Sequence, residues 1–224
     1  MNGKRAVALD KQCLYCVSTH LTLSLPRTAA LVKMVRFGTS NARPCLDECV
    51  AFVCSTVGRA WEAGMNDTRE NMGYPVLDVA QKVLDVCNSN EDTKSVTPMQ
   101  LLKLVYLCHG WTLGLLGRPL VREPVQAWRY GPVFPELYHA IKDYRHSPVP
   151  TVPGAHPIDL DSSEESIIEQ VCSGYGKWTG IQLSQLTHRR GSPWYVTWNE
   201  SRGARNAEIS SDLIEDHYRA LAKG

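Results

Sequence analysis

Apolar residues cover nearly the whole circumference of one predicted helix in the middle of the chain. Thr97 can cap its start with a side-chain oxygen, and Pro98 suits the first helical position, where no amide donor is needed. Gln100 stands three residues after the cap and can bond back to it. Gly117 is followed two residues later by a proline, and both residue types are typical of a helix end.

One narrow stripe of this helix is predicted to face solvent, because apolar residues cover the remaining circumference. The stripe consists of Gln100, Lys103, Leu107, Gly110 and Gly114. All other faces carry mainly apolar residues, so we expect the helix to lie at the centre of a domain.

The chain on either side of this helix also has clear patterns. Apolar residues recur at helical spacing over positions 76–87 and predict an amphipathic helix. After the central helix, residues 121–129 are predicted to form a short extended segment. Tyr130, Gly131 and Pro132 then predict a rigid corner, because a residue before proline avoids helical angles and glycine permits a close approach of the backbone.

Residue types that begin helices recur in the C-terminal half of the chain. The predicted starts are Pro135, Ser162 with Glu165, Thr179 with Gln182, Ser192 with Pro193, and Ser210. Ile181 and Leu186 are the apolar residues expected to anchor the short helix that begins at Thr179. Residues 145–163 contain four prolines without apolar periodicity and are predicted to form a surface loop. The fold class is therefore expected to be mainly α, a compact multi-helix domain with one short extended or β element.

Residues 1–71 show no clean helical or strand pattern and match no domain that we can identify. Two interpretations remain open: a genuine extension, for example a disordered one, or upstream sequence included by a start assigned too early. Met65 and Met72 both stand just before the regular pattern begins, which favours the second interpretation. We therefore expect the folded domain to span residues 72–224.

The eight cysteines are unevenly placed, with five of them in the first quarter of the chain. Two close-spaced pairs there loosely match the halves of a four-thiolate zinc site, namely Cys13 with Cys16 and Cys45 with Cys49. The 28 residues between the pairs exceed the common range of about 15 to 20, so we predict no metal and no cofactor. Three further cysteines lie in apolar helical patterns and are expected to be buried: Cys87, Cys108 and Cys172.

Charge and hydropathy narrow the range of partners. The formal net charge is +1, with 24 basic and 23 acidic residues, so no overall field favours nucleic acid. A modest basic cluster in the C-terminal third lacks a recognition helix or an aromatic stacking pattern, and nucleic acid is therefore not an expected partner. No apolar run approaches the ~18 residues of a membrane-spanning helix, and the N-terminus is a poor secretory signal. We expect a cytoplasmic protein without a membrane partner, in which the cysteines stay reduced.

Motifs of known enzymes are absent from the sequence. There is no nucleophile elbow, no glycine-rich phosphate loop and no metal-binding histidine pair at helical spacing. His109 lies on the buried side of the central helix and is expected to be a hydrogen-bonded core residue, because no partner stands at ligand spacing. We therefore predict no catalytic residue, although an unfamiliar active site can escape a motif search.

Three motifs occur in an order that matches a known family. They are TPMQLLKLVY at 97–106, AWRYGPVFPELY at 127–138, and LSQLTH at 183–188 with Pro193-Trp194. Together they resemble the Panacea domain, also called SocA-like, whose members are typically antitoxins of bacterial and phage toxin–antitoxin pairs. The resemblance covers roughly residues 74–224. It implies a non-enzymatic, phage-associated antitoxin that neutralises a cognate toxin, encoded by an adjacent gene, through direct protein–protein binding.

The residues expected to contact the partner lie at the Gly131-Pro132 corner and in the turn from His188 to Trp194. They are Trp128, Arg129, Tyr130, Gly131, Pro132, His188 and Trp194. Tryptophan, tyrosine and arginine dominate binding hot spots. We expect Trp128 to pack inward, with Arg129 and part of Tyr130 exposed. Two roles stay open for His188, contact with the partner or a hydrogen bond that orients the ends of neighbouring helices.

Two alternative functions remain open at the level of sequence. The first is an enzyme or small-ligand protein with a pocket near Trp128 and His188. The second is an adaptor that delivers its partner to a cellular protease.

Overall fold

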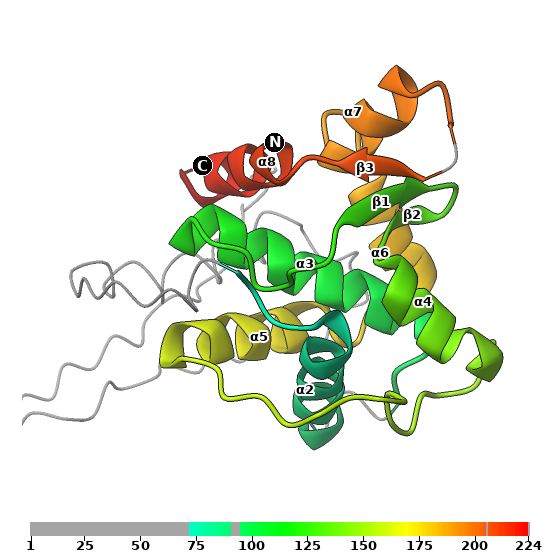
Figure 1. Ribbon diagram of the computed structural model, residues 1–224, viewed down its shortest axis with the longest axis vertical. Helices are drawn as coiled ribbons and strands as arrows, with labels where there is room; N and C mark the ends of the chain where they lie inside the picture. Colours follow the sequence, from blue (N-terminus) through cyan, green and yellow to red (C-terminus); the bar gives the residue numbers. More distant parts are fainter. Residues whose placement is uncertain (1–71, 91–94, 205, 224) are drawn as a thin grey trace, which may run out of the picture. The chain divides into compact units, whose positions relative to one another are not determined.

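The computed structural model describes residues 72–90, 95–204 and 206–223, all of which belong to one folded unit. In chain order its elements are α2 (Val76–Ser89), α3 (Pro98–Leu116), β1 (Val125–Trp128), β2 (Gly131–Val133), α4 (Pro135–Ile141), the 3-10 helix η1 (Lys142–Tyr144), α5 (Ser162–Tyr175), α6 (Gly180–Thr187), α7 (Pro193–Glu200), β3 (Ala207–Ile209) and α8 (Ser211–Lys223) (Figure 1). The mainly helical fold class predicted from the sequence is confirmed.

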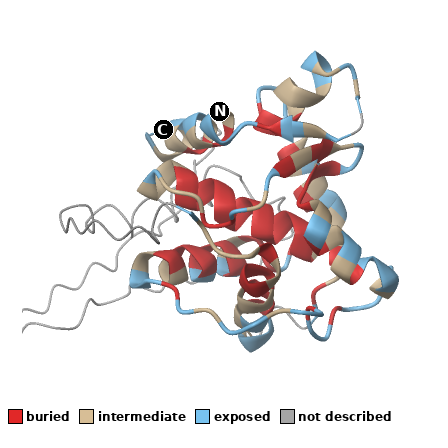
Figure 2. Cartoon of the chain, in the orientation of Figure 1, coloured by how far each residue is buried: buried red, intermediate tan, exposed pale blue. Residues whose placement is uncertain are grey.

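Helix α3 lies at the centre of this unit, as its apolar pattern predicts. Every residue from Leu101 to Leu113 is buried, and Figure 2 shows α3 buried along most of its length while the other helices are buried on one side. The backbone amide of Thr97 donates to Gln100 Oε1 at 2.9 Å, which completes the predicted capping box. Gly117 closes the helix with a left-handed φ of 68°.

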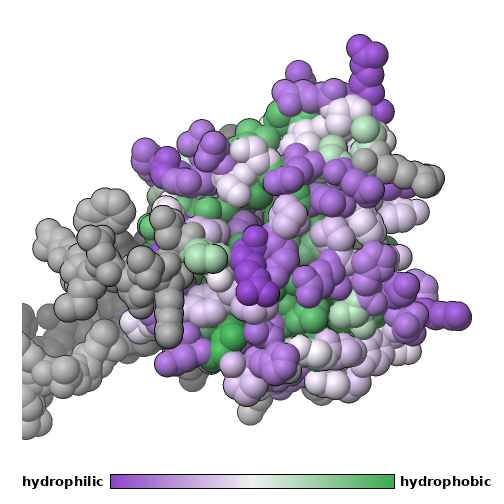
Figure 3. Space-filling view, in the orientation of Figure 1, coloured by the Kyte–Doolittle hydropathy of each residue, from purple (hydrophilic) through white to green (hydrophobic). Residues whose placement is uncertain are grey.

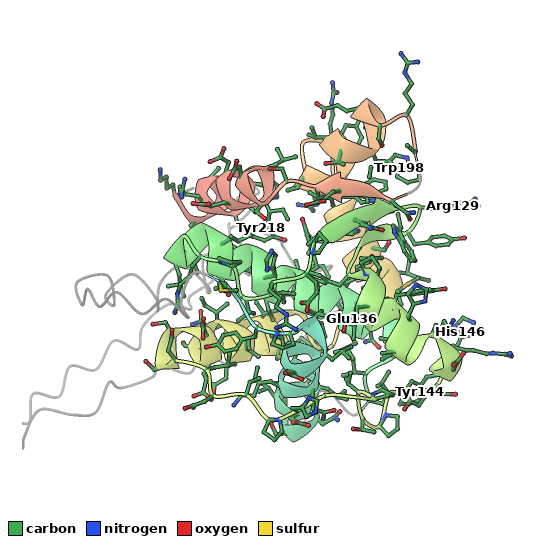
Figure 4. The ribbon with its side chains drawn as sticks, in the orientation of Figure 1. Arg129, Glu136, Tyr144, His146, Trp198 and Tyr218 are labelled. Atoms are coloured by element: carbon green, nitrogen blue, oxygen red, sulfur yellow. The ribbon has the colours of Figure 1, made fainter. Side chains whose placement is uncertain are left out.

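The predicted solvent-facing stripe of α3 is wrong, because other elements cover most of it. Lys103, Leu107 and Gly110 are all buried. Helix α8 crosses over the C-terminal half of α3, and Figure 4 shows Tyr218 of α8 beside this crossing. A Cβ atom at Gly110 would lie 2.2 Å from the Tyr218 ring, and one at Gly114 would lie 2.7 Å from the Tyr218 backbone. The two glycines therefore permit the close packing of α8, which no local pattern in α3 can show.

Helices α2 and α5 pack against α3 and against each other (Figure 1). The three cysteines predicted to be buried are buried here, and Cys87 Sγ donates to Cys172 Sγ at 2.9 Å. Helix α5 begins one residue earlier than predicted. Asp161, rather than Ser162, is its N-cap, because its carboxylate accepts from the amides of Ser163 and Glu164 and also pairs with Arg118.

The predicted extended segment is part of a three-stranded antiparallel sheet with the order β2-β1-β3. Strands β1 and β2 form a hairpin in which Trp128 pairs with Gly131, and β1 also pairs with β3, with Val125 opposite Ile209. Local sequence indicated only β1. The other two strands contain three residues each, and β3 depends on pairing with β1, which lies far from it in the chain.

The segment between η1 and α5 forms a loop over α2, as predicted. Side chains of α2 satisfy its backbone: Gln81 Oε1 accepts from the Val152 amide at 2.8 Å, and Asp78 Oδ1 accepts from the His156 amide at 2.7 Å. Val149 and Val152 are buried and anchor the loop to the core. Figure 3 shows that polar side chains occupy most of the face seen there, with smaller apolar areas between them.

Candidate functional site

The β1–β2 hairpin ends in a two-residue turn made by Arg129 and Tyr130. Both residues have negative φ angles, whereas Gly131 has a φ of 107°, a conformation that side-chain-bearing residues rarely adopt. A Cβ atom at Gly131 would lie 2.7 Å from Lys103 Nζ and 3.0 Å from Thr187 Oγ1. Glycine is therefore required at this position for two reasons: its backbone angle, and the lack of room for a Cβ atom.

Side chains from three helices hold the backbone of this corner. Trp194 Nε1 of α7 donates to the Trp128 carbonyl at 2.8 Å, Ser184 Oγ of α6 donates to the Tyr130 carbonyl at 2.9 Å, and Lys103 Nζ of α3 donates to the Pro132 carbonyl at 2.9 Å. Such bonds fix the position of the turn before any partner arrives, which lowers the entropic cost of binding.

Lys103 is the unusual member of this support. Its side chain is buried, and within the described ranges no carboxylate lies at ion-pairing distance from it. Burial disfavours the charged amine and lowers the pKa of Lys103 to about 7. Its predicted place on a solvent-facing stripe of α3 is wrong, because the corner lies over it and accepts its hydrogen bond.

His188 and Trp194 form a stacked pair beside the corner. Their ring centroids are 3.7 Å apart with an interplanar angle of 12°, and Trp194 also stacks on Trp198. Burial, and secondly the charge of Lys103, lower the pKa of His188. Its Nε2 atom is buried, and no hydrogen-bond partner for it is found among the described residues. The stacking supports Trp194, whose indole nitrogen holds the corner.

The seven residues predicted to bind a partner therefore come together in space but differ in exposure. Arg129 and Tyr130 are exposed, and the Arg129 guanidinium carbon lies 5.6 Å from the centre of the Tyr130 ring. Trp128 and His188 are half-buried. The other three are buried and can act on a partner only by shaping the corner: Gly131, Pro132 and Trp194. Figure 4 shows Arg129 at the tip of the hairpin.

A groove with a volume of about 790 Å³ lies on one side of the hairpin. Its walls come from the first turns of α3, from the hairpin, from α4 with the segment after it, and from the start of α6. Trp128, Arg129 and Tyr130 line it, whereas the described lining residues do not include His188 or Trp194. The groove therefore adds a concave surface to the exposed tip.

Most of the residues that line this groove were not predicted from the sequence. Lys142, Arg145 and His146 follow α4 closely, and this short basic run was the available signal. Ile181 was expected to anchor α6 in the core, and this prediction is wrong, because its side chain is 67% exposed at the edge of the groove. Its neighbours in sequence could not indicate which face of so short a helix would be covered.

Other candidate chemistry has a structural explanation or lies outside the described residues. Val121 donates its amide to His109 Nδ1 at 3.2 Å, and burial lowers the pKa of His109 to about 4, so this histidine is the hydrogen-bonded core residue that we predicted. The loosely spaced cysteines at 13, 16, 45 and 49 fall in the part that is not described. Within residues 72–90, 95–204 and 206–223, no three His, Cys, Asp or Glu side chains gather as they would around a metal ion.

The helices were also assessed for membrane insertion. In the part of the chain that the structure describes, none combines the length and apolar character needed to cross a bilayer.

Comparison with known proteins gives two matches and one negative result. Residues 101–195, which include the hairpin, the groove-lining α4 and the Trp194 support, match the family described as Antitoxin SocA-like, Panacea domain. The chain is 29% identical over 136 residues to a protein named antitoxin SocA from Caulobacter vibrioides (strain NA1000 / CB15N). That match covers 55% of this chain and 72% of the relative. No solved structure gives a significant match.

Proposed function

We propose, from the match of residues 101–195 to the SocA-like Panacea domain family of antitoxins, that the protein neutralises a cognate toxin by binding it directly. The observation that carries the proposal is the exposed Arg129–Tyr130 tip, held from below by three side-chain hydrogen bonds. A rigid tip that presents tyrosine and arginine has the properties of a binding hot spot.

The construction of the corner supports a role in recognition. A buried lysine is costly for folding, and a short hairpin could be built without one. The cost of burying this lysine is understandable if binding requires the tip to be held in one position, because an ordered tip gives up less entropy on association. The tip therefore suits a protein partner better than a purely structural role does.

The remaining parts of the proposal concern the gene that encodes the toxin, the compartment in which the two proteins meet, and the residues in contact. We propose that the toxin is encoded by an adjacent gene, that the two proteins meet in the cytoplasm, and that neutralisation is stoichiometric and not catalytic. The residues proposed to contact the toxin are Arg129 and Tyr130 directly. Trp128, Gly131, Pro132, His188 and Trp194 are proposed to act by shaping and supporting the tip.

Co-expression tests this function. The full chain is produced together with the product of each adjacent reading frame, and growth and co-purification are measured. We expect one product to stop growth alone, and the full chain to restore growth and to co-purify with it. The double variant Arg129→Ala with Tyr130→Ala should weaken the complex more than about tenfold, whereas the exposed control Arg202→Ala should not.

Two results would contradict direct neutralisation. Restored growth without a stable complex would indicate an enzyme, and restored growth only in cells that retain a particular protease would indicate an adaptor. Growth unaffected by every neighbouring product would remove the antitoxin proposal itself.

A second candidate function is binding of a small molecule in the groove beside Trp128. The volume of the groove favours this candidate, since ~300–1,000 Å³ is the usual range for ligand sites. Screening a metabolite library by thermal shift would test it, with Trp128→Phe as the variant expected to change the response.

A further inference from the structure

The groove beside the hairpin has an apolar interior. Its inner walls include Met99, Leu102, Val133, Tyr138 and Ile141, and Ile181 stands exposed at the edge. A largely exposed isoleucine beside a concave apolar surface is unusual for a surface that meets only water. The shape and chemistry of the groove suit apolar side chains of an occupant.

The rim of the groove carries charge of one sign. Arg129, Lys142 and Arg145 line it together with His146, and all four side chains are exposed. No aspartate or glutamate is among the described residues that line the groove. Figure 4 shows Arg129 and His146 coming from different elements, the hairpin tip and the segment after α4.

The excess of positive charge at the groove contrasts with the nearly balanced charge of the whole chain. The 224 residues contain 24 basic and 23 acidic side chains, so the excess at the groove is a feature of this surface. Among the described residues, Arg129, Lys142 and Arg145 form no salt bridge with an acidic side chain, and the Arg129 guanidinium lies over the ring of Tyr130. Three cations without acidic partners are available to an incoming acidic group.

We propose that this groove binds a segment of the toxin in which apolar side chains are flanked by acidic residues. The inference rests on the proposed function, because it specifies how the toxin is recognised. The apolar side chains of the segment enter the groove, and its carboxylates pair with the cations of the rim. Rim charges of this kind mainly direct association and register, whereas the apolar contacts hold the segment in place.

A polypeptide fits the groove better than a nucleic acid does. Nucleic-acid binding relies on cations spaced along a phosphate backbone and on aromatic faces open for base stacking. Here the cations stand at the rim of an apolar interior, and Trp128 lies half-buried, packed edge-on against Tyr138. A segment with alternating acidic and apolar residues matches both parts of the surface.

The experiment compares two exposed arginines that have nearly the same φ angle. Arg145 lines the groove and Arg202 does not, yet both are exposed and both have a left-handed φ, 54° and 53° respectively. Binding of the purified toxin, identified as the growth-inhibiting neighbour product, to the full chain is measured by calorimetry. We expect Arg145→Glu to raise Kd about tenfold and Arg202→Glu to change it less than about twofold.

A second pair of variants tests the apolar part. Ile181→Glu places a charge at the groove edge and should raise Kd more than about tenfold, whereas Met72→Glu, at an equally exposed apolar residue outside the groove, should leave it unchanged. Overlapping 15-residue peptides from the toxin then locate the segment. Replacing its acidic residue by lysine should restore binding to the Arg145→Glu chain.

The outcomes separate this inference from the proposed function. Tight toxin binding that Arg145→Glu and Ile181→Glu leave unchanged would overturn the groove and keep the antitoxin proposal. Failure of the unmodified chain to bind any neighbour product would overturn both. If Arg145→Glu instead abolishes self-association of the free chain, or binding of a 15-nucleotide single strand, the groove serves a second copy or a nucleic acid and the inference is wrong.

Discussion

The two halves of helix α3 are covered in different ways. Over its C-terminal half, Gly110 and Gly114 let α8 approach until the Tyr218 side chain lies directly on the helix. Over its N-terminal half, the β1–β2 corner lies on Lys103, and hydrogen bonds to carbonyl groups hold it there. The C-terminal half of α3 is covered through close packing, and the N-terminal half through polar contacts.

The difference indicates which half of α3 lies beside groups that can rearrange. Close packing of α8 against the two glycines leaves little room for rearrangement. The polar half lies beside the Lys103 amine, whose pKa is lowered to about 7, and beside the exposed Arg129–Tyr130 tip, and it borders the groove. Stability should therefore depend most on the C-terminal half of α3, and recognition on the N-terminal half.

Gly114→Ala should have the largest effect on stability. A Cβ there would lie 2.7 Å from the Tyr218 backbone and 2.8 Å from the Arg219 nitrogen, so α8 has to move. We expect the free energy of unfolding, measured with urea, to fall by about 3 kcal/mol. Gly174→Ala in α5 is the control, because nothing lies within 4 Å of its Cβ position, and helix propensity should then raise stability by about 0.5 kcal/mol. Equal effects of the two variants would contradict close packing as the cause.

Gly131→Ala should have the next largest effect. The new Cβ would meet Lys103 Nζ and Thr187 Oγ1, and the φ of 107° adds strain, so we expect a loss of about 2 kcal/mol. Gly191→Ala, at a φ of 84° with open space around it, should lose only about 1 kcal/mol from backbone strain. The difference between the two variants measures the contact beneath the corner, and no difference would mean that the contact is unimportant.

Lys103 should make stability depend on pH. Its folded pKa of about 7 lies below the ordinary value of 10.5, so between these values the unfolded chain binds the proton and the folded chain does not. The burial penalty is thus full below pH 7 and is relieved as pH rises. Relative to Lys103→Met, the unfolding free energy of the unmodified chain should rise by about 1.5 kcal/mol from pH 7 to 8.5. Parallel urea titrations that show a constant difference would contradict this assignment.

Arg129→Ala with Tyr130→Ala should affect stability least. Both side chains point away from the core, so we expect a change below about 0.5 kcal/mol in the same urea titrations. A loss above about 1 kcal/mol would mean that the tip belongs to the structural support and is not a free recognition surface.

Features governed by neighbouring residues could be predicted from the sequence. The capping box of Thr97 and Gln100 and the left-handed closure at Gly117 involve residues a few positions apart. The start of α5 was nearly ambiguous, because Asp161 with Glu164 and Ser162 with Glu165 have the same spacing. Contact with Arg118, 43 residues away, favours the aspartate.

Features governed by distant residues could not be predicted in the same way. Lys103 is buried because Pro132 and Thr187 lie over it, and Gly110 because Tyr218 does. The exposed tip at Arg129 and Tyr130 was predicted by residue type, whereas the groove was not, since its walls come from four separate segments. Whether these surfaces bind a toxin stays a prediction.

The continuous burial of α3 from Leu101 to Leu113 has a consequence for hydrogen exchange. Amides in a helix segment buried on every side exchange only when the whole unit unfolds, so their exchange rates report the global free energy. A bound partner raises that free energy in proportion to its affinity and concentration. The slowest amides of α3 would therefore report the strength of a complex formed at the hairpin tip, without a label on either protein.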